Sequence, residues 1–363
     1  MPTRIIGSGV SGEKPFRVLA LDGGGMRGLY TAKVLDALTH RFSEKPAAAF
    51  DPGAAFDLIV GTSTGGILTC ALAAGISIGK VAALYEAKGC SVFPHPVPNR
   101  KNKAGSLFFA ATHLNSPAND GVGLHDALVD LFGTATIGET YARRKIAFCI
   151  QALEMATHAP IVFKSGHLEG KHRDDTMTLV DACMATTAAP IIFPPARVKV
   201  AGADRVMCDG GLWANSPILP GLIEALKICG DCTIQVVSVG TCPPPVGTFI
   251  PKDGAWGLAK WKFGLGIVEA SIDAQAGAAE FQFEQLRPHL RVDASLVRLH
   301  QTAPPEDHQN IIGLDRADPK AIDAMKQLAE RDADTIHGEA TAVDSEIAFL
   351  KEIFTNLPEV EQP

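Results

Sequence analysis

The segment FDLIVGTSTGGILTCALAA, residues 56–74, decides the fold of this chain of 363 residues. Its first five residues predict a short buried strand, and its last part, from Thr64 to Ala74, predicts a buried helix. Between them, Gly61 and Gly65 flank Ser63 at a spacing of two residues on either side. Glycines at these places permit a sharp strand-to-helix turn that presents the serine hydroxyl at the end of the strand. The segment therefore predicts an α/β protein with a candidate nucleophile at Ser63.

Composition and charge narrow the class of protein. Hydrophobic residues make up 46% of the chain, charged residues 20%, and the net charge is −7. An acidic chain is not expected to bind DNA or RNA, and its charge alone would not hold it on an anionic membrane. Residues 58–79 carry no charge over a length that could cross a bilayer, but five glycines interrupt them. We therefore expect a buried strand, turn and helix there, no signal peptide, and a cytoplasmic protein.

The eight cysteines are scattered through mostly apolar stretches. This distribution predicts reduced, buried thiols and no disulfide framework. Cys229 and Cys232 have CxxC spacing, but no second pair of cysteines or histidines accompanies them. We interpret the pair as a turn after a helix, with a metal or redox role as the weaker alternative. No metal site is expected.

Strand-like and helix-like segments alternate along most of the chain. Strands are expected at residues 17–21, 56–60, 147–153, 160–164, 197–201, 206–208, 233–239 and 290–299. Helices are expected at residues 28–41, 64–74, from about 80, and at 178–188, 217–228, 267–286, 319–337 and 341–354. This alternation predicts a mostly parallel central sheet with helices on both faces. The expected organisation is a flexible arm (residues 1–14), a catalytic domain (residues 15–300) and a helical C-terminal extension packed on the same domain (residues 301–363), with a long irregular loop at residues 89–123.

A glycine-rich loop follows the first expected strand, as GGGMRG at residues 23–28. It matches the GxGxxG pattern of dinucleotide sites, but the second expected strand ends without the acidic residue that would bind a ribose. A nucleotide-binding protein that uses this loop stays open as an alternative class. We favour an oxyanion hole formed by Gly23, Gly24, Gly25, Met26, Arg27 and Gly28, in which successive backbone N–H groups converge on a carbonyl oxygen. Arg27 is interpreted as positioning the loop, attracting a phosphate or forming a structural salt bridge.

Asp209 comes directly after the apolar residues 206–208 and directly before Gly210 and Gly211. Asp-Gly-Gly is also a common turn, but a buried aspartate with a raised pKa could accept a proton from Ser63. No histidine stands in a recognisable motif. An α/β-hydrolase triad completed by His289 or His300 is the alternative.

Taken in this order and spacing, GGGMRG, GTSTG and DGG resemble the patatin-like phospholipase family. Further matches are ATTAAP at residues 185–190, FPP at 193–195, SVGT at 238–241, and the residues Asn215 and Pro217. The resemblance covers about residues 15–245. It implies a three-layer patatin-like fold and a Ser63/Asp209 dyad, with the elbow formed by Gly61, Thr62, Thr64 and Gly65. It also implies hydrolysis of an ester bond in a glycerophospholipid through an acyl-enzyme, without a metal or another catalytic cofactor.

Two segments have the composition of lipid contacts. Phe108 and Phe109 follow a basic stretch, and Trp256 and Trp261 stand among lysines. Aromatic side chains beside cations suit a membrane interface, although packing on the sheet or at a subunit contact of a homo-oligomer would explain them equally. The expected location is the cytoplasm, peripheral to the inner membrane when the enzyme is active.

The length and helical extension also resemble bacterial patatin-like effectors that cyclic oligonucleotides switch on in anti-phage defence. Such a ligand would be an activator and not a catalytic cofactor. Basic residues that could attract it are Arg100, Lys101, Arg143, Arg144 and Lys145, for which a solvated surface is the competing interpretation. An unregulated esterase or lipase of lipid catabolism is the alternative function.

Overall fold

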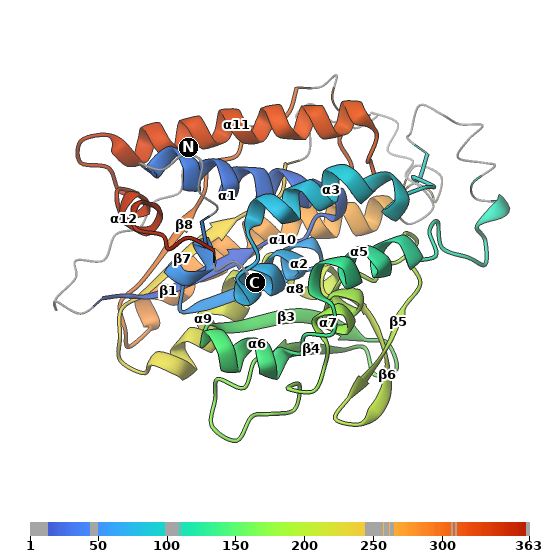
Figure 1. Cartoon of the computed structure of the whole chain (residues 1–363), viewed down its shortest axis with the longest axis horizontal. Helices are drawn as coiled ribbons and strands as arrows, with labels where there is room; N and C mark the ends of the chain where they lie inside the picture. Colours follow the sequence, from blue (N-terminus) through green and yellow to red (C-terminus); the bar gives the residue numbers. More distant parts are fainter. Residues whose placement is uncertain are drawn as a thin grey trace.

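The computed structural model describes residues 14–43, 50–98, 109, 111–243, 257, 261, 265–305, 308 and 311–360. Residues 1–13 of the expected N-terminal arm therefore lie outside the described residues. An eight-stranded sheet forms the centre of the molecule, with helices on either side (Figure 1).

Five neighbouring strands of the sheet are parallel, in the spatial order β3, β2, β1, β7, β8. Their bounds are β1 Phe16–Leu21, β2 Leu58–Thr62, β3 Ala147–Glu154, β7 Ile234–Val239 and β8 Ala294–Arg298. The other three strands pair in antiparallel fashion, β4 and β6 with β3, and β5 with β6. These are β4 Ala159–Lys164, β5 Ala196–Val200 and β6 Ala203–Asp209. The sheet is thus mixed, with the expected parallel strands at its centre and antiparallel strands on one side.

Strand β3 has two neighbours on a single edge. β2 pairs with its first part, up to Thr62 beside Gln151, and β6 pairs with its last part, beginning with Asp209 beside Ala152. Because Gln151 and Ala152 are consecutive, the C-terminal ends of β2 and β6 meet end to end on this edge. The residue after Thr62 is Ser63. This register brings Ser63 and Asp209 together although 146 residues separate them.

Side chains point alternately to the two faces of the sheet along each strand. Both faces are apolar here, and helices cover both of them. Leu19, Leu21 and Ile59 face one core, and Val18, Ala20 and other alternate residues face a second. The first core is covered by α1 (Gly28–Phe42), α2 (Thr64–Ala74), α3 (Ile78–Val92), α5 (Val122–Phe132), α6 (Ile137–Arg144), α7 (Leu179–Thr186), α11 (Pro319–Thr341) and α12 (Phe349–Thr355). The second is covered by α9 (Ile218–Cys229) and α10 (Leu265–Leu286). Short helical turns are η1 (Gly25–Arg27), η2 (Pro52–Ala55), α8 (Gly211–Ala214) and η4 (Arg287–His289). The layers are helix, sheet and helix.

The expected helices are present, but their ends differ and two helices were not predicted. α5 begins at Val122, inside the stretch 89–123 that was expected to be irregular, and α6 follows it; α3 also extends into this stretch, to Val92. The sequence carried a signal for α6, because Thr136 and Glu139 form a capping box at its start. α12 begins at Phe349, eight residues later than expected. Asp344 has a positive φ of 57°, which is incompatible with α-helical backbone, so the helix predicted from residue 341 cannot run through it.

Helix α11, in the C-terminal region, packs along α1. The hydroxyl of Tyr30 on α1 donates to the buried carboxylate of Asp332 at 2.6 Å. At the surface, Arg41 pairs with Glu330 and Asp334. Apolar side chains of α11 belong to the same core as those of α1. The C-terminal region is therefore an integral part of the helical layer.

The prediction of reduced, buried cysteines was wrong for three residues. Cys229 and Cys232 form a disulfide, because the chain turns back at the end of α9 and brings their Cα atoms to 5.7 Å. Cys90 is free but exposed. The remaining five, Cys70, Cys149, Cys183, Cys208 and Cys242, are free and buried as expected.

Candidate active site

Ser63 lies at a strained turn between β2 and α2. Its φ of 54° and ψ of −124° are unfavourable for a residue with a side chain. A Cβ on Gly65 would collide with the carbonyl oxygens of Leu21 and Asp22, so only glycine fits there. A hydrogen bond of 2.5 Å from the Thr62 hydroxyl to the Ala214 carbonyl also fixes the position of the turn. Ser63 is therefore held in the geometry that the sequence predicted.

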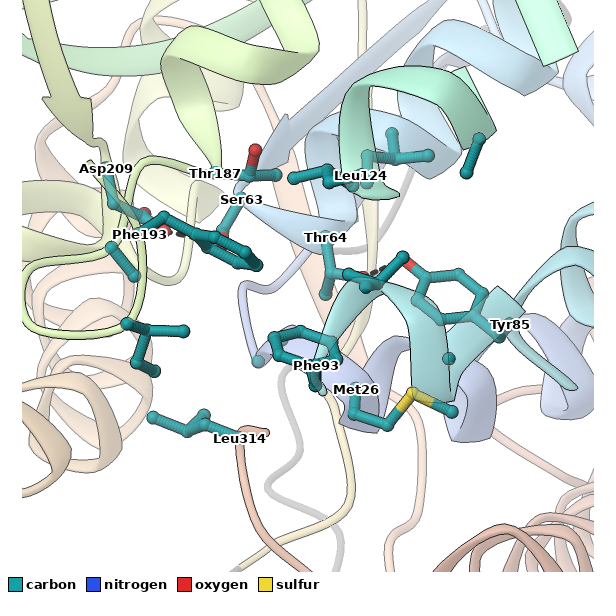
Figure 2. A pocket seen from close by; sticks show the side chains of 18 of the residues that line it. Met26, Ser63, Thr64, Tyr85, Phe93, Leu124, Thr187, Phe193, Asp209 and Leu314 are labelled. Carbon is teal, nitrogen blue, oxygen red and sulfur yellow. Dashed lines mark hydrogen bonds between the residues drawn. The ribbon is translucent and has the colours of Figure 1, made fainter. Parts of the chain in front are cut away.

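The Ser63 hydroxyl donates a hydrogen bond of 2.7 Å to Oδ2 of Asp209 (Figure 2). The other carboxylate oxygen of Asp209 accepts from the N–H of Gly211 at 2.7 Å. Both side chains are buried. Burial raises the pKa of Asp209 to about 6, against the opposing effect of the hydrogen bonds from Gly211 and Ser63. Asp209 thus has the position and the basicity of a general base for Ser63.

Thr186 holds the backbone of the nucleophile. Its Oγ1 accepts a hydrogen bond from the N–H of Ser63 at 2.8 Å and donates to the carbonyl of Gln151 at 2.5 Å. Thr186 belongs to the ATTAAP segment, but the sequence gave no indication of this role. Its hydroxyl links the turn to the middle of β3.

The glycine loop lies against Ser63 and offers two free amides. The N–H of Gly23 donates to the Asn215 carbonyl at 3.0 Å, and that of Met26 donates to the Leu314 carbonyl at 2.7 Å. The amides of Arg27 and Gly28 are used inside the loop and its helical turn. Those of Gly24 and Gly25 have no acceptor among the residues that the structure describes. The predicted oxyanion hole of Gly23 to Gly28 was therefore too wide, because the amides of Gly23, Met26, Arg27 and Gly28 are occupied, that of Met26 by the Leu314 carbonyl.

Side chains from other segments hold the glycine loop in position. Asn215 and Thr241 both donate to the carbonyl of Gly23, at 3.2 Å each. Arg27 is buried, donates to the carbonyls of Gly24 and Cys242, and lies 3.6 Å from a carboxylate oxygen of Asp273. Of the three interpretations offered for Arg27, the structure thus supports loop positioning with a salt bridge.

Ser63 and Asp209 open into an apolar pocket (Figure 2). Its walls come from α3, α5, the loop after α7, and single residues of α10 and of the segment before α11: Leu84, Tyr85, Val92, Phe93, Leu124, Leu128, Ile192, Phe193, Ile272 and Leu314. Lys88 is the cationic side chain among the lining residues. The free volume is about 60 Å³, well below the roughly 300–1,000 Å³ of typical ligand sites. The pocket is narrow and chemically suited to a hydrocarbon chain.

No histidine contributes to this pocket. All eleven histidines lie within the described residues, and none lines it. The Asp209 carboxylate is already bonded to Ser63 and Gly211. The nearest partner of the His300 ring is Thr302, at 3.3 Å. The alternative triad with His289 or His300 is therefore not formed.

Other predicted site residues lie elsewhere or outside the described structure. Phe108 and Trp256 fall on undescribed residues, as do Arg100 and Lys101. Phe109 is half-buried against the core and stacks on the His113 ring, with ring centroids 4.3 Å apart. Arg143 donates to the Ala74 carbonyl and Arg144 pairs with Asp51. Trp261 is half-buried. None of these observations places an aromatic side chain at a lipid surface.

One group of potential metal ligands was missed by sequence reasoning. The ligand atoms of Cys149, His167 and Glu224 lie within 4.8 Å of one another. Burial raises the pKa of the Cys149 thiol far above its usual value. The ammonium of Lys164 lies 2.5 Å from Glu224 and occupies the carboxylate. The donor set is therefore that of a salt-bridge network and does not fit a cation site.

Within the described residues, no helix combines the length and the apolar character that a membrane crossing requires. The uncharged stretch at residues 58–79 is divided between β2, α2 and the start of α3, as the glycines predicted.

The fold and the serine turn define a class of ester hydrolase, and comparison with known proteins agrees. The family model described as patatin-like phospholipase matches residues 19–222. A cGAMP-activated phospholipase of Pseudomonas aeruginosa is 32% identical over 91% of each chain, and one of Vibrio cholerae is 30% identical over 87% of this chain and 88% of its own. A cUMP-AMP-activated phospholipase of Escherichia coli is 26% identical over 79% of this chain and 81% of its own.

The chain belongs to the patatin-like phospholipase family. It is an enzyme that hydrolyses lipid esters. Family membership also disfavours the alternative of a nucleotide-binding protein built on the glycine loop.

The raised pKa of Asp209 predicts a pH profile. Only the ionised carboxylate can accept a proton, so kcat/KM for a soluble ester should increase with pH and level off above about pH 7, one unit above the pKa of about 6. Well below pH 6 it should fall about tenfold per pH unit. The measurement is kcat/KM from pH 4.5 to 9, with folding checked at each pH. A profile that is flat down to pH 4.5 would contradict Asp209 as the base.

Gly25 offers a test of the loop. Its φ is 56°, and a Cβ there would collide with the carbonyl of Leu314. Gly25→Ala should therefore displace the two free amides and lower kcat about 10²- to 10³-fold, the usual effect of losing one oxyanion donor. The control is Gly202→Ala, which also has a positive φ, of 79°, but no atom within 4 Å of the added carbon. Equal activity of the two variants would argue against an oxyanion role.

Proposed function

We propose that this protein is a phospholipase A type enzyme that cleaves carboxylic esters of membrane glycerophospholipids with the Ser63/Asp209 dyad. The observation that carries the proposal is the 2.7 Å hydrogen bond between Ser63 and Asp209 at the end of an apolar pocket. The free amides of Gly24 and Gly25 border the same space. Nucleophile, base, oxyanion donors and acyl-chain site are then adjacent.

The first half of the reaction forms an acyl-enzyme. Ser63 Oγ attacks the ester carbonyl carbon while Asp209 accepts its proton. The negative charge that develops on the carbonyl oxygen is stabilised by the N–H groups of Gly24 and Gly25 and by the N-terminus of α2. The intermediate collapses, the bond to the glycerol oxygen breaks, and that oxygen takes the proton from Asp209. The lysophospholipid leaves and the acyl group stays on Ser63.

The second half repeats the proton transfers with water. Asp209 accepts a proton from a water molecule that attacks the acyl carbonyl, and the same amides stabilise the oxyanion. Collapse releases the fatty acid and returns the proton to Ser63. The mechanism uses only groups of the chain and water.

We propose that a cyclic oligonucleotide activates the enzyme, as part of anti-phage defence. The similarity to cGAMP-activated phospholipases extends over nearly the whole chain and includes the region after residue 300. The small free volume of the pocket, about 60 Å³ against roughly 300–1,000 Å³ in typical ligand sites, supports a regulatory step that widens it. The enzyme would act from the cytoplasm at the inner-membrane surface, and association into homo-oligomers belongs to the same proposal.

We further propose that residues 15–300 form the catalytic domain and residues 301–363 an extension that packs on it. The contacts of α11 with α1 and the shared apolar core support this division without an independent second domain.

The test is fatty-acid release from vesicles of bacterial phospholipids, with and without a panel of cyclic dinucleotides. Ser63→Ala serves as the blank. Release by the wild-type protein that increases with one cyclic dinucleotide supports both parts of the proposal. Equal release at every nucleotide supports the unregulated esterase instead, and no release from any lipid contradicts the phospholipase assignment.

A further inference from the structure

The side chain of Gln275, on α10, joins the two ends of the short helix α8. Its Oε1 accepts from the N–H of Asn215 at 2.6 Å, and its Nε2 donates to the carbonyl of Gly211 at 2.8 Å. Gln275 is half-buried, follows Asn215 by 60 residues in the chain, and does not line the Ser63 pocket. It therefore reaches the active site only through the backbone of other residues.

These two hydrogen bonds take the place of one bond of an α-helix. In a continuing helix the N–H of Asn215 would donate directly to the carbonyl of Gly211, four residues earlier. The preceding bond of this series is present, from the N–H of Ala214 to the carbonyl of Gly210 at 2.9 Å. The next one is split, because the Gln275 carboxamide lies between donor and acceptor and bonds to both. α8 therefore ends at Ala214, and one carboxamide group sets the distance from Gly211 to Asn215.

The orientation of this carboxamide is determined by its partners. The N–H of Asn215 can only donate and the carbonyl of Gly211 can only accept, so exchange of the amide oxygen and nitrogen would lose both bonds. The hydroxyl of Ser271, one turn earlier on α10, lies 3.4 Å from Nε2 as an additional acceptor. The position thus requires a side chain of this length with one acceptor and one donor at its end.

Each end of α8 holds one part of the catalytic machinery. At its start, the N–H of Gly211 donates to Oδ1 of Asp209 at 2.7 Å. At its end, the carbonyl of Asn215 accepts from the N–H of Gly23 at 3.0 Å, and the Asn215 side chain donates to the Gly23 carbonyl at 3.2 Å. Gly23 is followed directly by Gly24, whose amide is free. The span of α8 therefore relates the position of the base to that of the oxyanion donors.

Helix α10 also contacts the glycine loop directly. Two residues before Gln275, the carboxylate of Asp273 lies 3.6 Å from the guanidinium of Arg27. Arg27 in turn donates to the carbonyl of Gly24 at 3.4 Å. Ile272, the next residue along α10, lines the Ser63 pocket. One turn of α10 thus contacts the pocket, the glycine loop and the turn that carries the base.

We propose that Gln275 is a positioning residue for ester hydrolysis, whose carboxamide, inserted between Gly211 and Asn215, places the glycine loop at the correct distance from Ser63. The inference rests on the proposed dyad mechanism. It adds to that mechanism a residue from outside the three sequence motifs, which all end by Gly211.

Loss of the carboxamide has a defined structural consequence. The N–H of Asn215 and the carbonyl of Gly211 lose their partners, and they can regain one by closing the direct helical bond. This movement carries Gly23 with it and shifts the free amides of Gly24 and Gly25. Those amides stabilise charge that is present only in the transition state, so the chemical step is affected more than binding of the ester.

The first test is steady-state kinetics of Gln275→Met on a soluble short-chain ester. Methionine has a similar length but neither the donor nor the acceptor. We expect kcat to fall about 10- to 100-fold, because a displacement of about 1 Å in an active site has an effect of this order. KM should stay within about threefold of the wild-type value, and Gln275→Ala should behave in the same way. Gln282→Met, at an exposed glutamine of the same helix, is the matched control and should keep kcat within about twofold.

A second measurement distinguishes positioning from a general loss of structure. A trifluoromethyl ketone inhibits by a reversible adduct, in which Ser63 Oγ bonds to the ketone carbon, the Ser63 proton passes to Asp209, and the ketone oxygen becomes an oxyanion. Its inhibition constant for Gln275→Met should increase by the same factor by which kcat/KM falls. The corresponding secondary alcohol cannot form the adduct, and it should bind the variant and the wild type equally. Thermal melting checks that each variant is folded.

The outcomes separate this inference from the proposed function. Parallel losses of kcat and of affinity for the ketone, with KM and binding of the alcohol unchanged, support it. Wild-type kcat in Gln275→Met overturns it and leaves the proposed function intact. Equal losses for ketone and alcohol, or unfolding of both Gln275 variants, also overturn it, because the role of Gln275 is then purely structural. Ester hydrolysis that survives Ser63→Ala contradicts the proposed dyad, and the inference fails with it.

Discussion

Ser63→Ala is expected to lower the rate of ester hydrolysis by about 10⁴-fold or more, because loss of the nucleophile in a serine hydrolase has an effect of this order. The substitution removes one oxygen atom and its hydrogen bond to Asp209. Oxyanion donors and pocket remain in place, so a small residual rate above that of water is expected. The measurement is release of fatty acid from a soluble short-chain ester and from vesicles.

A matched control separates chemistry from folding. Ser295→Ala removes a serine hydroxyl from β8, outside the lining of the pocket, and should leave the rate within twofold. Ser63→Ala should also retain the wild-type melting temperature within a few degrees. If it hydrolyses the ester at more than a hundredth of the wild-type rate, another group is the nucleophile.

Asp209→Asn is expected to lower the rate about 10³- to 10⁴-fold, because an amide cannot accept the serine proton. The shape is almost unchanged, and the amide oxygen can still accept from the N–H of Gly211. The residual rate should lose the dependence on a group with a pKa of about 6. Asp204→Asn, an exposed aspartate on the same strand, is the control.

The same substitution should increase stability at alkaline pH. The folded-state pKa of Asp209 is raised from 3.8 to about 6, so ionisation of this buried group destabilises the fold as pH rises through that interval. Above pH 7 the cost is on the order of 3 kcal/mol, and a neutral asparagine removes it. Urea unfolding should show Asp209→Asn more stable than the wild type at pH 8 and not at pH 4. Equal stability at both values would contradict the raised pKa.

Much of the site could be predicted from local sequence. The turn at Ser63 is formed by a strand, a helix and two glycines that are all adjacent in the chain, so local sequence is enough to predict it. Asp209 was recognisable from the turn that follows it. The contact between them was not visible in this way, because it depends on β2 and β6 sharing one edge of β3.

The remaining differences also have non-local causes. The Met26 amide is occupied by the Leu314 carbonyl, which comes from a segment nearly 300 residues later. The ion pair of Lys164 with Glu224 joins β4 to α9, and no spacing rule relates the two. In the sequence Arg143 and Arg144 were candidates for binding an anionic ligand. In the structure Arg143 donates to the Ala74 carbonyl and Arg144 pairs with Asp51. Charge patterns alone therefore did not indicate which basic residues are free.

The end-to-end meeting of β2 and β6 has a consequence for biosynthesis. A nascent or truncated chain that stops before Asp209 contains the nucleophile but not its base. Even a chain that includes Asp209 has no reactive pair until β6 docks on β3 beside β2. A chain that is interrupted before or within β6 is therefore expected to lack ester hydrolase activity even though it contains Ser63.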